Sequence, residues 1–253
     1  MLSVLLCVKN EEKNLPNCIK SISFADEIVV IDDFSKDSTV EIASELGCTV
    51  YQRAMQDDWS GQRNFGISQC HGDWIFVLDA DEIVSEKLAE EIRSCCKRYE
   101  NNPICFWIQR ENKFRFNKAT HGVLRSDWVL RLFPKASARY EGRVHEKLVT
   151  ELPTQRIRGA VLYHYTYSNW DAYFNKFNKY TTLGAQQRYE KGKKANFWFD
   201  ILLRPWFAFF KMYVLERGFL DGKLGFILSV NHFFYTMTKY VKLYYLNRSN
   251  GEL

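Results

Sequence analysis

The sequence predicts an α/β fold with a mostly parallel central sheet, followed by a helical extension at the carboxyl end. The first observation is a rhythm of short apolar runs and amphipathic segments that alternate over roughly eighty residues, as in open α/β sheets with right-handed crossovers. The second is that two apolar runs, residues 27–31 and 74–78, end abruptly in carboxylates. Because buried parallel strands point their carboxyl ends at the edge where ligands bind, both acidic clusters are expected there.

The expected elements follow in chain order from local patterns. The predicted strands of the first hundred residues are 2–8, 27–31, 49–53 and 74–78. The predicted helices are 10–22, one that follows Ser38, 60–70 and 85–99. Ser38 with Glu41 three residues later has the form of a capping box, and Gly47 and Gly72 are expected to end helices. Further strands are expected at 104–110, 129–133 and 160–165.

The Asp79-Ala80-Asp81 sequence after the fourth strand predicts a cation site. Two aspartates separated by one small residue can place oxygens on a divalent cation and on a neighbouring hydroxyl. A hard ion such as Mg²⁺ or Mn²⁺ held by few protein carboxylates takes its other ligands from phosphates and water. The expected partner is therefore a nucleotide diphosphate. The alternative is a helix N-terminus that carries acidic residues because of the helix dipole.

Composition favours a single cytoplasmic enzyme. The 253 residues are 46% apolar, which is enough for one core with an appendage. Seven cysteines without a Cys-x-x-Cys pair argue against a disulfide framework or a zinc site. Residues 2–8 are too short for a signal-peptide core. The absence of Gly-x-Gly-x-x-Gly and of a Gly-Lys-Ser phosphate loop argues against dinucleotide oxidoreductases and P-loop ATPases.

The last sixty residues are both basic and aromatic. Residues 191–253 hold ten Lys and Arg against four Asp and Glu, so the whole net charge of +5 resides in this tail. Residues 197–245 hold 16 of the 40 aromatic residues. This combination predicts helices that lie on an anionic membrane surface. A membrane span is not expected, because the longest candidate, residues 224–246, contains Lys239 and Lys242. Packing of the aromatics onto the catalytic domain or a second subunit is the alternative.

Four segments together resemble the inverting glycosyltransferases of family 2, which have the GT-A nucleotide-sugar-binding fold. They are VKNEEKNLPNCIKSI, EIVVIDDFSKDST, GQRNFGISQCHGDWIFVLDADE and YEGRVHEKLV, in the family's order over residues 3 to 150. The whole length, including RPWFAFFKMYVLERGFLDGKLGF, is similar to bacterial enzymes that add glucose to a heptose of the lipopolysaccharide inner core.

The resemblance implies that the amino-terminal part binds the donor nucleotide. Asp33 would hydrogen-bond the uracil, with Asp32 as the alternative reader, because a carboxylate accepts the imide N–H that cytosine lacks. Asp81 would be the firmest metal ligand. The remaining positions that the resemblance places at the nucleotide sugar or the metal are Val8, Asn10, Arg63, Asn64, Asp79 and Ala80.

A second chemical centre is expected at Arg143-Val144-His145-Glu146. Displacement at an anomeric carbon needs a base for the acceptor hydroxyl opposite the departing diphosphate. The resemblance supports Glu146 as that base. His145 would orient Glu146, contact the diphosphate or ligate the metal, since a neutral imidazole can do each. His164, after an apolar run, is a further candidate ligand of the metal or diphosphate, or else a buried structural histidine.

Acceptor binding is expected from a charged stretch between the predicted strands. A Trp beside an Arg can stack on a sugar face and pair with a phosphate, which makes Arg125 and Trp128 candidates. An exposed Arg and a half-buried Trp without a function are the alternative.

The sequence thus predicts a GT-A catalytic domain over residues 1–167 and a helical extension over 168–253. Within the first, residues 1–100 would bind the nucleotide sugar and 101–167 the acceptor. The expected activity is metal-dependent, inverting transfer of a hexose, as glucose from UDP-glucose, to inner-core heptose at the cytoplasmic face of the inner membrane. The expected partners are a lipid-linked saccharide and the membrane surface, not a nucleic acid polymer. The alternatives are a polyprenyl-phosphate, capsule or protein acceptor, or a non-catalytic sugar-binding scaffold.

Overall fold

The computed structural model describes residues 1–114, 121–142, 146–167 and 169–252. These residues form two compact units. The first comprises Met1–Glu111 and Asp127–His164, and the second comprises Asn112–Ser126 and Tyr165–Leu253. The division into domains at residues 167 and 168 stays a prediction.

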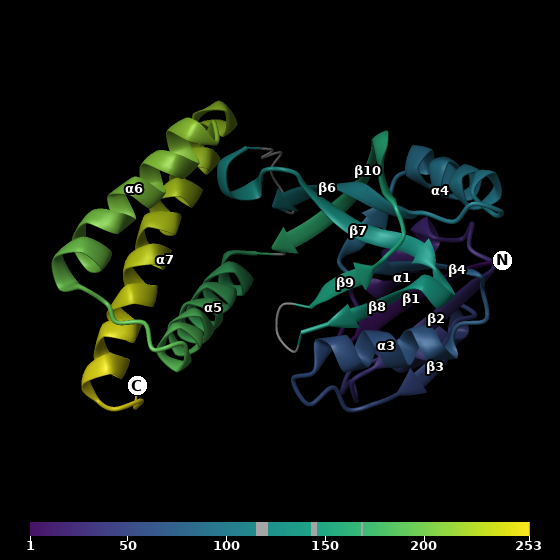
Figure 1. The fold of residues 1–253 in the computed structure, drawn as a ribbon, viewed down its shortest axis with the longest axis horizontal. Helices are drawn as coiled ribbons and strands as arrows, with labels where there is room; N and C mark the ends of the chain where they lie inside the picture. The colour runs from purple at the N-terminus through teal and green to yellow at the C-terminus, as the bar shows by residue number, and fades with distance from the viewer. Residues whose placement is uncertain (115–120, 143–145, 168, 253) are drawn as a thin grey trace. The chain divides into compact units, whose positions relative to one another are not determined.

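The first part of the sheet in the first unit is parallel, as expected. Its strands are β1 (Leu2–Val8), β2 (Glu27–Asp32), β3 (Thr49–Gln52) and β4 (Trp74–Leu78). They lie in the order β3-β2-β1-β4 (Figure 1). Val8 pairs with Asp32 and Leu6 with Leu78, so the acidic residues after β2 and β4 lie at one edge of the sheet. This confirms the predicted α/β class.

The sheet continues beyond β4 with four further strands, several of which pair antiparallel. These are β7 (Asp127–Pro134), β6 (Cys105–Phe114), β10 (Thr154–Tyr167) and the short β5 (Glu82–Val84). β7 pairs antiparallel with β4 and with β6, and β10 pairs antiparallel with β5. A separate hairpin joins β8 (Ala138–Glu141) to β9 (Lys147–Thr150), and a 3₁₀ turn, Lys135–Ser137, precedes it.

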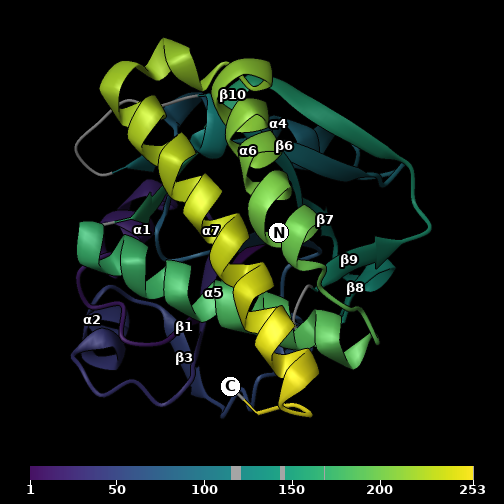
Figure 2. The ribbon, with the colours of Figure 1, turned by 90° about the vertical axis from the view of Figure 1, so that its left-hand side faces the viewer.

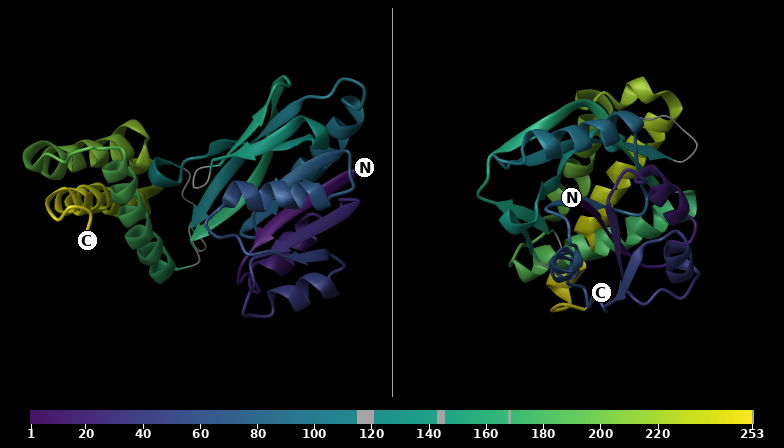
Figure 3. Two further views of the ribbon diagram at one scale, coloured as in Figure 1. Left: turned by 60° about the horizontal axis from the view of Figure 1, so that its bottom comes forward. Right: turned by 90° about the vertical axis from the view of Figure 1, so that its right-hand side faces the viewer.

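Helices cover both faces of this sheet (Figure 3). One apolar core joins alternate residues of β1, such as Leu6, to α1 (Leu15–Ser21), α2 (Thr39–Glu45) and α4 (Glu86–Arg98). The other core joins the intervening residues, such as Leu5, to α3 (Trp59–Gln69) and the β8–β9 hairpin. Side chains that point to either face of the sheet are thus buried. These strands therefore appear in the sequence as continuous apolar runs.

Three local predictions are wrong in detail. The first helix begins at Leu15 and not at residue 10, because Asn10 adopts a left-handed φ of 55°. Ser38 precedes α2 without a side-chain cap, so the predicted capping box is absent. Gly47, with φ +80°, does follow α2 as expected. α3 ends before Gly72, where a Cβ would lie 2.6 Å from Ser3 Oγ, so close packing explains that glycine.

The second unit is helical, which confirms the predicted extension. Its main helices are α5 (Trp170–Glu190), α6 (Arg204–Phe210) and α7 (Gly222–Arg248). π-helical turns, Phe197–Leu203 and Lys211–Leu215, flank α6, and the 3₁₀ turns are Gly122–Leu124 and Gly218–Asp221. α7 packs against both α5 and α6 (Figures 1 and 2). No helix within the described ranges is long and apolar enough to cross a membrane.

Candidate active site

Hydrogen bonds between Asp79 and Glu82 close the acidic turn after β4, which comprises residues 79–82. The Asp79 N–H donates to Glu82 Oε2 at 2.9 Å, and the Glu82 N–H donates to the Asp79 carbonyl at 3.0 Å. Glu82 is completely buried, and burial raises its pKa against the lowering effect of Arg131 and Arg110. Glu82, for which no sequence pattern predicted a role, is therefore the residue that shapes the turn.

Two arginines hold the carboxylate of Asp79. Arg63 Nη2 lies 3.0 Å from Asp79 Oδ1, and Arg131 Nη2 contacts Asp79 Oδ2. Burial by itself would raise the pKa of Asp79, but Arg131 and Arg63 outweigh it and hold that pKa well below its usual range. Asp79 is therefore ionised at any physiological pH, and its charge is balanced by two guanidinium groups.

Arg63 also reaches the predicted base. Its Nη2 lies 3.3 Å from Glu146 Oε1, and the Glu146 side chain is only 17% exposed. The acidic turn and Glu146, which are far apart in the sequence, therefore meet at one buried guanidinium. His145, like Arg143 and Val144, lies outside the described residues, so its role stays a prediction.

Asp81 and His164 form a second pair beside this turn. His164 Nε2 lies 3.3 Å from Asp81 Oδ2, because β10 pairs with β5 in the register that sets His164 opposite Glu82. Within the ranges that the structure covers, no three His, Cys, Asp or Glu residues are grouped to hold a metal ion. Of the described residues, Asp81 and His164 thus offer one carboxylate and one imidazole, while Asp79 is bound to arginines. Such a pair fits a cation whose other ligands come from phosphate and water.

Three buried polar atoms have no hydrogen-bond partner among the residues that the structure describes. They are Arg63 Nε, Arg131 Nη1 and the Tyr140 hydroxyl. The Arg63 guanidinium also lies 5.0 Å from the centre of the Tyr140 ring. An unsatisfied buried donor costs about 1–3 kcal/mol, which an anionic ligand with free acceptor oxygens would recover. These atoms fit a site built for an anion.

Arg131 was missed by the sequence analysis, although the sequence carries a signal for it. It is a lone charged residue within the apolar run 129–133, and it is 5% exposed in β7. A charge in a predicted buried strand needs a buried partner. The same reasoning would have found Arg110, which binds Asp127 through two nitrogens at 3.0 and 2.8 Å and reaches Glu82 at 3.3 Å.

The predicted uracil-binding aspartates differ in their surroundings. Asp32 is fully buried and accepts hydrogen bonds from the Ser35 N–H, the Ser35 hydroxyl and Gln52. It thus shapes the turn after β2. Asp33 bonds Lys9 Nζ at 2.7 Å and the Met55 N–H at 3.0 Å. Burial acts to raise the pKa of Asp33, but these two bonds lower it overall. Uracil recognition by either residue stays a prediction.

Val8 and Asn10 lie at the same edge of the sheet as these aspartates. The Val8 carbonyl accepts from the Asp33 N–H at 2.9 Å. The Asn10 N–H donates to Ser35 Oγ, and its side-chain oxygen accepts from the Lys36 N–H, each at 2.8 Å. The loops after β1 and β2 are therefore tied together. Beside them, Phe34 is exposed with a left-handed φ of 48°, a feature that no sequence pattern indicated.

Asn64 and Ala80 occupy supporting positions. The Asn64 amide accepts from the Tyr140 N–H and donates to the Tyr140 carbonyl, both at 2.8 Å. It thereby holds β8 against α3, and a contact with the nucleotide stays a prediction. Ala80 is buried in the apolar core, where a small residue lets the acidic turn pack against α1.

The two predicted acceptor residues fall in different compact units and have separate partners. Arg125 donates to the Gly122 carbonyl at 3.2 Å and lies 3.5 Å from Glu216. The Trp128 ring lies 4.9 Å from the guanidinium of Arg156. Neither arrangement identifies a sugar, so both assignments stay predictions.

Comparison with known proteins adds an independent finding. Residues 3–151 match the model of the family described as Glycosyl transferase family 2. The lipopolysaccharide core biosynthesis glycosyltransferase LpsC of Rhizobium meliloti is 29% identical over 252 residues, which is 96% of this chain and 92% of that protein. An uncharacterized glycosyltransferase of Rickettsia typhi is 27% identical, over 96% and 86% of the two chains.

A solved structure has a similar fold. Residues 1–349 of Staphylococcus aureus TarS, in complex with UDP, superpose with a TM-score of 0.50 at 13% identity, covering 98% of this chain and 91% of that one. At this identity the likeness concerns the fold alone.

Proposed function

Because this chain belongs to glycosyl transferase family 2 and is a glycosyltransferase, we propose that it transfers a hexose from a UDP-hexose, UDP-glucose, to a heptose of the lipopolysaccharide inner core. The relative LpsC, named for lipopolysaccharide core biosynthesis, supports the acceptor class. The similar fold of TarS, solved with UDP, supports the nucleotide.

The observation that carries the proposal is the shared guanidinium of Arg63. It contacts Asp79 of the acidic turn at 3.0 Å and Glu146 at 3.3 Å. A transferase needs a base for the acceptor hydroxyl and a positive, anion-binding surface for the departing diphosphate. Glu146 provides the first. Arg63 and Arg131 provide the second, and within the described ranges Arg63 Nε and Arg131 Nη1 have no hydrogen-bond partner.

In the proposed reaction, Glu146 takes the proton of the acceptor hydroxyl. The acceptor oxygen forms its bond to the anomeric carbon as the bond from that carbon to the diphosphate breaks, so UDP leaves in one step with inversion. Arg63 and Arg131 bind and orient the diphosphate. Asp81 and His164 would hold Mg²⁺ or Mn²⁺, which when bound neutralises charge on the leaving group. Asp33, Val8 and Asn10 would bind the uracil and ribose at the neighbouring edge.

The test is a pair of conservative substitutions that leave the packing intact. We expect Glu146→Gln to abolish transfer but to keep UDP binding, because only the base is lost. Asp81→Asn should abolish transfer and also weaken Mn²⁺-dependent UDP binding in calorimetry. Glu141→Gln, an exposed acid on β8 paired with Arg139, is the matched control and should retain full transfer. Full activity of either test variant would remove that residue from the mechanism.

The acceptor is tested separately from the chemistry. Heptose-terminated core saccharide, polyprenyl phosphate and a peptide should be offered with UDP-glucose to the same preparation. Product from the core saccharide alone supports the proposal, whereas product from polyprenyl phosphate alone would replace the acceptor and leave the transferase assignment standing.

We further propose that the second unit rests on the anionic cytoplasmic face of the inner membrane, where a lipid-linked acceptor would be found. Large apolar side chains around α6 are exposed, with Trp198 70% and Trp206 64% accessible. The same patch includes Phe199, Leu203, Phe207 and Phe210. Exposed Lys211 and Lys223 lie on neighbouring elements. Each lysine near anionic lipid contributes about 1 kcal/mol, and a soluble monomer rarely exposes so many apolar groups together.

Vesicle flotation tests the membrane proposal. The full chain should bind phosphatidylglycerol-containing vesicles and should bind phosphatidylcholine vesicles much less. Trp206→Ser with Phe207→Ser should abolish binding, and Phe34→Ser, an exposed aromatic of the first unit, is the control. Unchanged flotation of the double variant, with loss of a dimer in sedimentation, would instead make this patch a subunit interface.

A further inference from the structure

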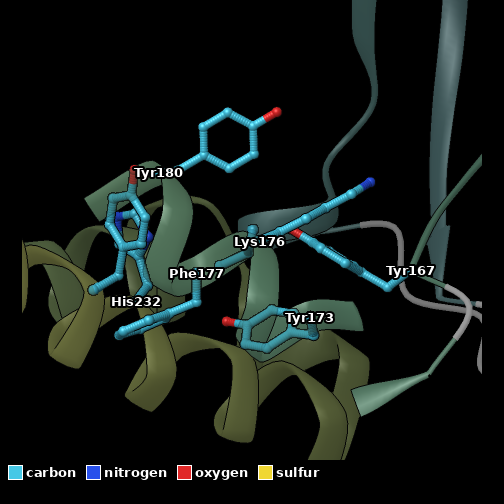
Figure 4. Close-up of a pocket in the computed structure, with 8 residues that line it drawn as sticks. Tyr167, Tyr173, Lys176, Phe177, Tyr180 and His232 are labelled. Atoms are coloured by element: carbon cyan, nitrogen blue, oxygen red, sulfur yellow. The ribbon is translucent and has the colours of Figure 1, made fainter. Parts of the chain in front are cut away.

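A hollow of about 290 Å³ lies within the second unit, and none of its lining residues belongs to the proposed chemistry. Five aromatic rings line it, namely Tyr167, Tyr173, Phe177, Tyr180 and Tyr235. Lys176 and His232 add the polar groups, and Figure 4 shows the labelled side chains arranged around the hollow. This is close to the lower end of the ~300–1,000 Å³ range of small-molecule sites, so it suits a ligand of about one or two rings.

The aromatic walls are held in place by one another. The rings of Tyr167 and Tyr173 lie 4.8 Å apart in an edge-to-face contact, and those of Phe177 and Tyr235 lie 5.6 Å apart. The His232 ring is stacked parallel to Tyr235 at 5.8 Å. Tyr173, which also lines the hollow, is 6% exposed. The walls therefore need no large rearrangement to present flat apolar faces to a ligand.

The charge around the hollow is positive. Lys176 Nζ donates to the Thr166 carbonyl at 2.9 Å and lies 5.5 Å from the centre of the Tyr167 ring. Burial, aided by Lys239, Arg125 and Lys211, lowers the pKa of His232 to about 4. His232 is therefore neutral at physiological pH and can donate or accept a hydrogen bond.

These features distinguish between two kinds of ligand. Aromatic cages often bind organic cations, but here Lys176 already lies over Tyr167, and Lys239 lies 5.4 Å from the Tyr235 ring. A third cation would be repelled. Flat aromatic faces also suit the C–H faces of a sugar ring, and an ammonium group is a point charge suited to phosphate or carboxylate.

We propose that this hollow binds an anionic saccharide, a sugar ring that carries a phosphate or carboxylate group. The inference rests on the proposed function, in that the ligand would be a charged part of the saccharide acceptor other than the sugar that receives the hexose. The aromatic rings stack on the ring of the sugar, and Lys176 pairs with its anionic group.

The experiment uses the full chain saturated with UDP and Mn²⁺, so that the donor site is filled. Glucose 6-phosphate is titrated by calorimetry, with glucose, inorganic phosphate and choline as comparison probes. Glucose 6-phosphate should bind more tightly than the other three. Lys176→Gln should weaken it roughly tenfold, the loss of one hydrogen bond to a charged group. Tyr180→Ala, which removes an exposed wall, should weaken glucose and glucose 6-phosphate alike.

Matched controls are available on the same helices. Lys179→Gln on α5 and Tyr245→Ala on α7 are exposed and do not line the hollow, so both should bind glucose 6-phosphate as the wild type does. Equal affinity of the wild type and Lys176→Gln for glucose 6-phosphate would overturn the inference, as would tighter binding of choline. If the protein binds UDP but not glucose 6-phosphate, only this inference is wrong. If the hollow binds glucose 6-phosphate but no core saccharide is glycosylated, the proposed acceptor is wrong instead.

Discussion

Replacement of Arg131 by Met should destabilise the first unit, because it leaves the buried carboxylate of Glu82 and the half-buried carboxylate of Asp79 short of positive charge. Arg131 Nη2 contacts Asp79 and lies 3.5 Å from Glu82, and Arg131 is itself buried. Breaking one partner out of a buried ion pair costs about 3–5 kcal/mol. Asp79 keeps Arg63 at 3.0 Å and Glu82 keeps Arg110 at 3.3 Å, so the loss should lie near the lower end, about 3 kcal/mol.

The pH dependence of this loss is the sharper part of the prediction. In the wild type the pKa of Asp79 is lowered, so its pairing stabilises the fold above the unfolded pKa and is lost only in strong acid. The pKa of Glu82 is raised by burial, and removal of Arg131 raises it further. As the pH falls, protonation of Glu82 removes its negative charge, and this reduces the destabilisation of the variant. The deficit in the free energy of unfolding should therefore be larger at about pH 7 than at about pH 5.

Urea unfolding followed by tryptophan fluorescence at the two pH values measures this deficit. Arg139→Met is the matched control, because Arg139 is exposed and pairs only with the exposed Glu141 among the described residues, and such pairs contribute little. A deficit for Arg131→Met no larger than that of the control, or one that grows on acidification, would refute the role of Arg131 as the buried counter-charge.

Two further predictions concern neighbours of this network. Asn64→Ala should lower the free energy of unfolding by about 1–3 kcal/mol, because both Tyr140 backbone groups lose their hydrogen-bond partner. Asn64→Asp keeps the acceptor oxygen and should therefore lower it less. Equal losses for the two variants would contradict this account. His164→Ala should raise the Mn²⁺ concentration for half-maximal UDP binding at least about tenfold, by analogy with losses at metal sites. The control is His71→Ala, which removes an exposed histidine paired with Glu27 and should not change that concentration. Equal titration curves for the two variants would remove His164 from the cation site.

The buried network also bears on what limits activity in acid. Because the pKa of Asp79 is held well below its usual range, protonation of Asp79 does not occur under ordinary assay conditions. A loss of activity in mild acid should therefore come from other groups, and Asp79 serves as a permanent negative charge that fixes Arg63 and Arg131. Arg63 is held in turn where it meets Glu146.

Local sequence patterns determined much of this protein by themselves. β1 and β4 span the predicted residues, and α4 lies within one residue of its expected ends, because an apolar run or a helical period reports burial directly. The position of Asp79 and Asp81 at the sheet edge followed from the end of β4. Motif order also identified the family.

Only the tertiary structure decided which side chains meet. His164 reaches Asp81 because β10 runs antiparallel to β5, and Arg131 reaches Asp79 because β7 pairs with β4. The sequence of each strand alone does not indicate which strand it pairs with. Hydrophobic periodicity records whether a residue is buried, whereas the partner of a buried charge depends on strand order and register, and these are set by the packing of the whole sheet.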